Sequence, residues 1–148
     1  MRKLKPLEYA FYLLKLRDRS IGEMEEKFRR REYDPKEAAE TMTFLIEKGF
    51  LNDEKFAENF VRFKKSLKPV GKFYLRNKLM EKKISTEIIE KVLSENADEV
   101  EEIAEATDRW LKRHQNIPKE KIYQKLVRHL LSRGFDWEKV KEAIMGKL

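Results

Sequence analysis

Residues 77–89 read NKLMEKKISTEII. The same arrangement of apolar and helix-capping residues recurs in residues 26–38, EKFRRREYDPKEA, and in residues 128–140, RHLLSRGFDWEKV. In each segment an apolar helical face leads into a residue suited to cap the next helix, and these residues are Asp34, Ser85 and Asp136. The three residues are spaced by 51 positions. Self-similarity at a fixed period of this size is typical of tandem helical arrays, so the spacing predicts three related units.

The same offset aligns apolar residues in the helices on both sides of the cap. The aligned sets are Met24, Leu75 and Leu126; Phe28, Leu79 and Leu130; Tyr33, Ile84 and Phe135; Ala38, Ile89 and Val140; and Met42, Leu93 and Ile144. An earlier helix in each unit aligns only if the loop length varies, which places Leu13 with Phe60 and Trp110. Each unit is therefore predicted to contain three helices.

Composition also favours helices, because only five glycines and four prolines interrupt a chain dominated by helix-forming residues. Ser20 with Glu23 forms a capping-box pattern, Asn52 is a further N-cap candidate, and Gly49 and Gly134 have the form of helix stops. The predicted helices span residues 7–18, 21–32, 35–48, 53–67, 71–83, 86–95, 98–114, 118–133 and 137–146.

These features predict an all-α protein, an elongated and curved array of three tandem three-helix repeats that resemble helix-turn-helix modules. The expected repeats span residues 1–50, 51–97 and 98–148. The second repeat holds a basic centre. Units of this size bury little core alone, so packing between neighbours should contribute to stability. The alternative is one compact bundle of nine helices.

Length and charge restrict the class of protein. The chain has 148 residues, 41% of them charged, a net charge of +7 and no cysteine, which excludes disulfides, thiolate nucleophiles and cysteine-ligated metals. The longest apolar stretch, residues 9–14, is too short for a signal peptide or a membrane span. We expect a cytoplasmic protein without a membrane partner, and the positive charge favours a polyanionic or acidic partner.

Positive charge is concentrated between Arg62 and Lys83, where nine basic residues accompany one acidic residue. The predicted partner-binding or DNA-binding residues are Arg62, Lys64, Lys65, Lys68, Lys72, Arg76, Lys78, Lys82 and Lys83, together with Arg29, Arg30 and Arg31 of the first unit. Phe63, Phe73 and Tyr74 could stack or anchor there, or belong to the core. The alternative is a solvated charged face. A strongly acidic segment, residues 95–108, follows the patch.

Motifs for catalysis are nearly absent. Gly71-Lys72 lacks the other residues of a phosphate-binding P-loop, and His114 and His129 each fit a structural or surface role. The acids of residues 95–108 lack a loop with convergent ligands. We therefore expect no enzyme activity, no metal and no cofactor.

Residues 45–57, LIEKGFLNDEKFA, together with Gly71 and the helix that ends at Ile84, resemble the centre of the RecX family of bacterial recombinase regulators. The family pattern is a glycine, an apolar pair, Asp, a basic residue and Phe-Ala, then a glycine-led helix that ends in Lys-Gly-Ile. Here Asn52 stands where Asp is commoner, Pro69 precedes the glycine instead of following it, and Lys82-Lys83-Ile84 replaces Lys-Gly-Ile. This helix must therefore end without its usual glycine.

The resemblance implies a protein that binds the RecA recombinase filament in its helical groove and inhibits its recombinase, ATPase and co-protease activities. Inhibition would follow from blocked filament extension or from promoted disassembly, with a role in DNA repair and the SOS response. Single- or double-stranded DNA is a further candidate partner, and we expect a monomer. The alternatives are a direct nucleic-acid-binding protein, which the units' helix-turn-helix outline also suits, and a structural scaffold.

Overall fold

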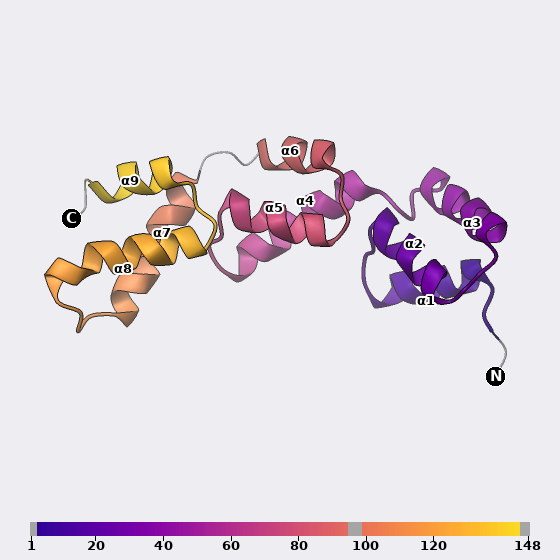
Figure 1. The fold of residues 1–148 in the computed structure, drawn as a ribbon, viewed down its shortest axis with the longest axis horizontal. Helices are drawn as coiled ribbons and strands as arrows, with labels where there is room; N and C mark the ends of the chain where they lie inside the picture. The colour runs from indigo at the N-terminus through magenta and orange to yellow at the C-terminus, as the bar shows by residue number, and fades with distance from the viewer. Residues whose placement is uncertain (1–2, 95–98, 146–148) are drawn as a thin grey trace.

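The computed structural model describes residues 3–94 and 99–145. Within them it contains nine helices and no strands, which confirms the all-α tandem-repeat fold (Figure 1). The helices are α1 (Pro6–Leu16), α2 (Ile21–Arg30), α3 (Pro35–Glu47), α4 (Asp53–Leu67), α5 (Lys72–Glu81), α6 (Thr86–Ser94), α7 (Val100–Arg113), α8 (Lys119–Ser132) and α9 (Trp137–Met145). The helix ends predicted at 95, 98 and 146, and the repeat boundary predicted at 97/98, lie outside the described residues.

The capping predictions are confirmed at several helix starts. The side chains of Ser20, Asp34 and Asn52 each accept a hydrogen bond from the backbone N–H three residues later, at 3.1, 3.2 and 3.0 Å. Gly49 and Gly134 adopt the left-handed backbone that ends a helix, with φ of 79° and 86°. These local signals, which are strong in the sequence, define the turns of each unit.

Lys83 is the residue that lets α5 end without a glycine. It adopts the left-handed conformation itself, with φ of 63°, and so does the equivalent residue of the first unit, Glu32, with φ of 57°. For a residue with a Cβ this conformation costs about 1–2 kcal/mol. The backbone path of the repeat is therefore kept at all three equivalent positions, although only Gly134 is a glycine.

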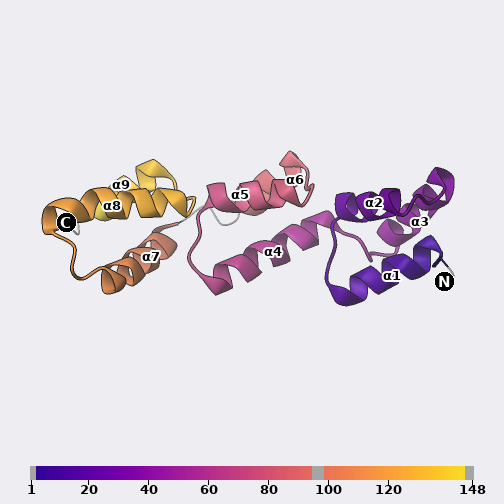
Figure 2. The ribbon, with the colours of Figure 1, turned by 60° about the horizontal axis from the view of Figure 1, so that its bottom comes forward.

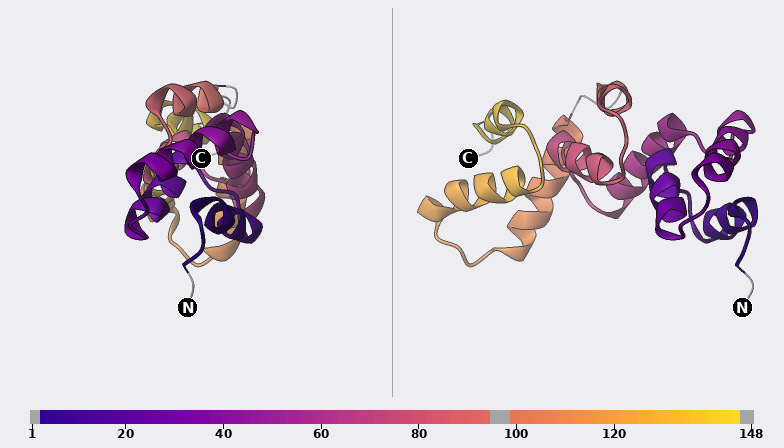
Figure 3. Two further views of the ribbon diagram at one scale, coloured as in Figure 1. Left: turned by 90° about the vertical axis from the view of Figure 1, so that its right-hand side faces the viewer. Right: turned by 45° about the vertical axis from the view of Figure 1, so that its right-hand side comes forward.

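Each unit has its own hydrophobic core, formed by α1–α3, α4–α6 or α7–α9. The aligned residues Met24, Leu75 and Leu126 are fully buried, with 0, 1 and 0% of their surface exposed. The three units follow one another along the long axis (Figures 1 and 2), and a view along that axis superimposes them (Figure 3). The compact-bundle alternative is therefore wrong.

The middle helices of the units, α2, α5 and α8, lie end to end in a row (Figure 2). The Ser20 hydroxyl, at the start of α2, donates to the Lys82 carbonyl at the end of α5, at 2.6 Å. The Gly71 N–H, at the start of α5, donates to the Arg133 carbonyl at the end of α8, at 2.8 Å. Both the donors and the acceptors are related by the 51-residue offset, so one junction geometry is used twice. The helix N-terminus, with partial positive charge, meets a C-terminus with partial negative charge in both cases.

Asp53 and Glu99, which we call the junction carboxylates, strengthen the two junctions. Asp53 accepts the Ile21 N–H at 2.8 Å, and Glu99 accepts the Lys72 N–H at 2.7 Å and the Asp136 N–H at 3.3 Å. Each carboxylate lies at the start of the first helix of one unit and binds the first N–H of the preceding unit's middle helix. Glu99 is buried, with 3% of its surface exposed. These bonds fix how each unit is oriented on the next.

Glycines allow the close approach at these junctions. A Cβ on Gly22 would lie 2.5 Å from the Lys83 Cβ, and a Cβ on Gly71 would lie 2.3 Å from the carbonyl of Gly134. At the free end of the row, the Lys3 ammonium instead donates to the carbonyl of Arg31, the residue equivalent to Lys82 and Arg133. The N-terminal segment thus supplies the donor to this carbonyl.

Candidate partner-binding surface

The residues predicted from the basic stretch, which we call the middle patch (Arg62, Lys64, Lys65, Lys68, Lys72, Arg76, Lys78, Lys82 and Lys83), lie on several elements. They occupy the last turns of α4, the loop after it, α5 and the turn that ends α5. The structure does not bring them to a single groove, because α4 and α5 also direct side chains toward neighbouring helices.

Several cations of the middle patch are neutralised by acidic residues from other elements. Arg76 forms two hydrogen bonds with Glu90 on α6, at 2.8 and 3.2 Å. Lys65 reaches Glu102 on α7, in the third unit, at 3.1 Å. These side chains join helices, so their charge is only partly available to a partner.

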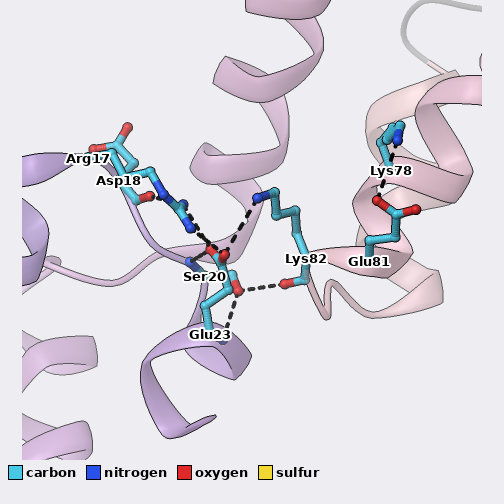
Figure 4. Close-up of polar contacts among 7 residues, drawn as sticks. All are labelled: Arg17, Asp18, Ser20, Glu23, Lys78, Glu81 and Lys82. Atoms are coloured by element: carbon cyan, nitrogen blue, oxygen red, sulfur yellow. Dashed lines mark hydrogen bonds and ion pairs between the residues drawn. The ribbon is translucent and has the colours of Figure 1, made fainter. Parts of the chain in front are cut away.

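The ion pairs at the first junction centre on Glu23 (Figure 4). Arg17 donates to both oxygens of this carboxylate, at 2.7 and 3.2 Å, and the Lys82 ammonium lies 3.6 Å away. Burial raises the pKa of Glu23, but the bonds from Arg17 and from the Ser20 N–H, with the charge of Lys82, hold that pKa below its usual value. Glu23 therefore stays ionised and links the first unit to the end of α5.

The first-unit arginines connect to the middle patch through Glu26. Arg29 and Arg30 both pair with this carboxylate, and the Lys83 ammonium lies 3.9 Å from it. Arg31 instead places its guanidinium 4.1 Å from the centroid of the Tyr9 ring. The predicted first-unit residues thus lie on α2 and the turn that follows it, and only some of them share a contact with Lys83.

The remaining cations of the middle patch lie around the loop between α4 and α5, and make no ion pair with any described residue. Arg62 donates to the Asn59 amide at 3.1 Å, and the ammonium groups of Lys64 and Lys72 lie over the rings of Phe60 and Phe73. Lys68 is exposed. These four cations are the most available part of the patch.

Exposed aromatic rings accompany these cations. Phe63 and Phe73 expose 58% and 42% of their surface, whereas Tyr74 is partly buried against the core of the second unit. Of the three aromatic residues singled out in the sequence, the two phenylalanines can reach a partner.

A groove of about 540 Å³ lies between α4, α5 and the loop that precedes α2. We call it the middle groove. It combines both signs of charge with aromatic residues, and its lining consists of Arg17, Asp18, Phe56, Asn59, Phe60, Phe63, Lys64, Lys78, Glu81 and Lys82. Lys78 pairs with Glu81 at 3.6 Å within it (Figure 4). Sequence reasoning missed Arg17 and Asp18 at this place, because they come from the first unit and no local pattern marks them.

None of the described helices is both long enough and apolar enough to cross a bilayer. Nor do three or more His, Asp or Glu side chains gather within residues 3–94 and 99–145 in a way that could hold a metal ion.

Comparison with protein families matches each unit separately. Family models described as the first, second and third three-helix domains of RecX match residues 7–45, 52–93 and 97–144. The "Regulatory protein RecX" of Chlorobium phaeobacteroides (strain BS1) is 32% identical over 142 residues, which cover 95% of this chain and 91% of that protein. The protein of the same name from Streptococcus gordonii is 29% identical, but this chain spans only 52% of its length.

A solved structure has the same fold. The crystal structure of RecX from Lactobacillus salivarius superimposes with a TM-score of 0.88 at 24% identity, covering 96% of this chain and 94% of that one. The likeness extends over all three units and includes their arrangement.

Proposed function

Since this chain belongs to the RecX family of regulatory proteins, we propose that it binds the filament of the RecA recombinase in its helical groove and inhibits its recombinase, ATPase and co-protease activities. It does so by blocking filament extension or by promoting disassembly. The observation that carries the proposal is the row of three units, joined by two equivalent junctions, with cations around the loop between α4 and α5.

The proposed contact uses the length of the array. The middle patch faces acidic surface on the filament and the backbone of its bound DNA, while an end unit contacts a second protomer. Binding shifts the filament toward an inactive state only if these contacts differ between filament conformations. A row of units with fixed junctions suits this requirement, because it can hold two protomers at one relative orientation.

The protein acts in this proposal as a monomeric, non-enzymatic regulator in the cytoplasm, in DNA repair and the SOS response, without metal or cofactor. The family membership and the middle patch support it.

The test uses the four cations that form no ion pair within the described residues. Replacing Arg62, Lys64, Lys68 and Lys72 by Ala should weaken inhibition of filament ATPase by about tenfold and flatten its salt dependence, because charge contacts to a polyanion are salt-sensitive. The matched control replaces Lys15, Lys36, Lys48 and Lys141, which are exposed and lie outside the middle patch. Undiminished inhibition with an unchanged salt slope would refute the assignment.

The second candidate function is direct binding of nucleic acid, which the exposed Phe63 and Phe73 beside free cations favour. A titration of DNA alone, run beside the filament assay across salt concentrations, separates the two. Inhibition at concentrations that leave free DNA unbound selects the recombinase regulator.

A further inference from the structure

The middle groove has a counterpart in the third unit. A groove of about 490 Å³ lies between α7 and α8, and we call it the third-unit groove. Its lining consists of Trp110, His114, Ile117, Lys125, Arg128, His129 and Ser132. His129 is related to Lys78, and Ser132 to Glu81, by the 51-residue offset, so the two grooves lie at corresponding places of successive repeats.

The two grooves differ in charge. Asp18 and Glu81 line the middle groove, whereas no acidic residue lines the third-unit groove, where Ser132 takes the place of Glu81. Lys125 and Arg128 are exposed and form no ion pair with any residue that the structure describes. They lie three residues apart on α8, hence on neighbouring positions of one helix face. The third-unit groove is therefore cationic without internal compensation.

Its floor is a pair of aromatic rings. The His114 ring stacks on Trp110 with centroids 4.4 Å apart and an interplanar angle of 20°. His114 Nδ1 lies 2.8 Å from the Trp110 carbonyl oxygen, which fixes the orientation of the imidazole. Trp110 is 4% exposed, so the partly buried His114 presents the accessible face of the pair. Proteins that bind single-stranded nucleic acids combine a flat ring surface with nearby cations, so that bases stack on the rings and the cations neutralise the phosphates.

We propose that the third-unit groove binds one nucleotide of a single-stranded nucleic acid, with a backbone phosphate at Lys125 and Arg128 and the base against the Trp110–His114 pair. Its volume falls within the range of about 300–1,000 Å³ that accommodates small ligands. An acidic protein segment would match the charge but not the ring surface. A duplex keeps its bases stacked and cannot place one in the groove. The site requires no recombinase, so it goes beyond the regulatory function.

His129 supports this assignment from the wall of the groove. Burial lowers the pKa of its imidazole, and the charges of Arg133, Arg113 and His114 lower it further. A bound phosphate would oppose these effects by stabilising the protonated ring. The cations that face His129 thus favour an anion as the ligand.

The experiment uses the fluorescence of Trp110 as a reporter. The chain has two tryptophans, so Trp137→Phe leaves Trp110 as the single emitter. Titration of the full chain with a thymidine 12-mer should quench this emission. Replacing Lys125 and Arg128 by Ala should weaken binding about tenfold and reduce the salt slope by about 0.7, which is the contribution of one phosphate contact to a single strand. The control Lys36→Ala with Lys48→Ala removes the same charge from the first unit and should leave both values unchanged.

Several results overturn the proposal. If the Lys125/Arg128 variant and the control bind the thymidine 12-mer with equal affinity, the third-unit groove is not the binding site. If an abasic 12-mer binds as tightly as the thymidine 12-mer, no base occupies the groove. If a duplex quenches Trp110 to the same extent, the same conclusion follows. A glutamate 12-mer that binds as tightly assigns the groove to an acidic protein instead. No recombinase is present in these titrations, so their failure is distinct from a failure of the regulatory function.

Discussion

Residues 62–83, which contain the middle patch, and residues 109–133 of the third unit carry almost the same formal charge but offer it differently to a partner. Residues 62–83 contain nine basic residues and one acidic residue, and residues 109–133 contain eight and one. In the middle patch, Arg76 and Lys65 pair with acidic residues of α6 and α7. Within 109–133, the ion pair found among the described residues is that of Arg109 with Glu105. Local charge in a sequence therefore overestimates the available charge wherever neighbouring helices supply counter-ions.

The largest expected effect follows from breaking the junction that separates these two regions. Glu99→Ala leaves the N–H groups of Lys72 and Asp136 without their acceptor, and an unsatisfied buried group costs about 1–3 kcal/mol. We expect the free energy of unfolding to fall by about 2–5 kcal/mol in chemical denaturation. Glu101→Ala, at an exposed neighbouring position, is the control. If the two variants unfold alike, Glu99 does not hold the junction.

A second substitution set makes the middle patch resemble the third unit. Glu90→Gln and Glu102→Gln release Arg76 and Lys65 from their counter-ions. Affinity for a thymidine 12-mer should rise about two- to fivefold, with a steeper salt slope, because more cations then contact phosphates. Glu40→Gln with Glu47→Gln changes the net charge equally at exposed positions of α3. An identical gain in both variants would mean that net charge alone matters.

The pH dependence of binding distinguishes the third-unit groove from the middle groove, which contains no histidine. The pKa of His129 lies below its ordinary value in the free protein, and a bound phosphate raises it. The complex therefore binds more protons than the free chain, and affinity should increase about three- to tenfold as pH falls from about 7.5 to about 5.5. His129→Gln should flatten this profile in the same fluorescence titration. An affinity that falls on acidification contradicts the linkage.

The smallest effect is expected at the left-handed turns. Glu32→Gly relieves the strained conformation at the free end of the row and should raise the free energy of unfolding by about 1 kcal/mol. Lys83→Gly should gain less, because it also removes the side-chain contact of Lys83 with Gly22 at the junction. Thermal unfolding of the two variants compares the effect of a glycine at the end of the row, at residue 32, with its effect at the first junction, at residue 83. A larger gain at Lys83 would contradict the structural role of that contact.

The fold was predictable because its determinants are local and periodic. The aligned apolar residues and the caps Ser20, Asp34 and Asn52 each act within a few residues, so the sequence marks them directly. The junctions depend on pairs distant in the chain, such as Ser20 with Lys82, and only the three-dimensional arrangement identifies them. For the same reason the basic stretch could be found, but not which of its cations are neutralised. Whether those residues bind a partner is still a prediction.

The third-unit groove shows a different reason for a missed site. Trp110, His114 and Lys125 are spread over two helices, and each residue alone fits a structural role. His114 is the C-cap residue of α7. Its stacking on Trp110, beside the cations of α8, is a property of the packed helices that no single segment displays.

The end-to-end row of α2, α5 and α8 gives the molecule polarity. Every middle helix points the same way, and the two extremities are unlike: one is the last turn of α2 with the Lys3 ammonium on it, the other is the first turn of α8. A partner that has a direction of its own, as any strand or helical polymer does, can accept such an array in only one of two orientations. Reversing the molecule would exchange the third unit, with its groove, for the first unit, so orientation determines which unit meets which end of the partner.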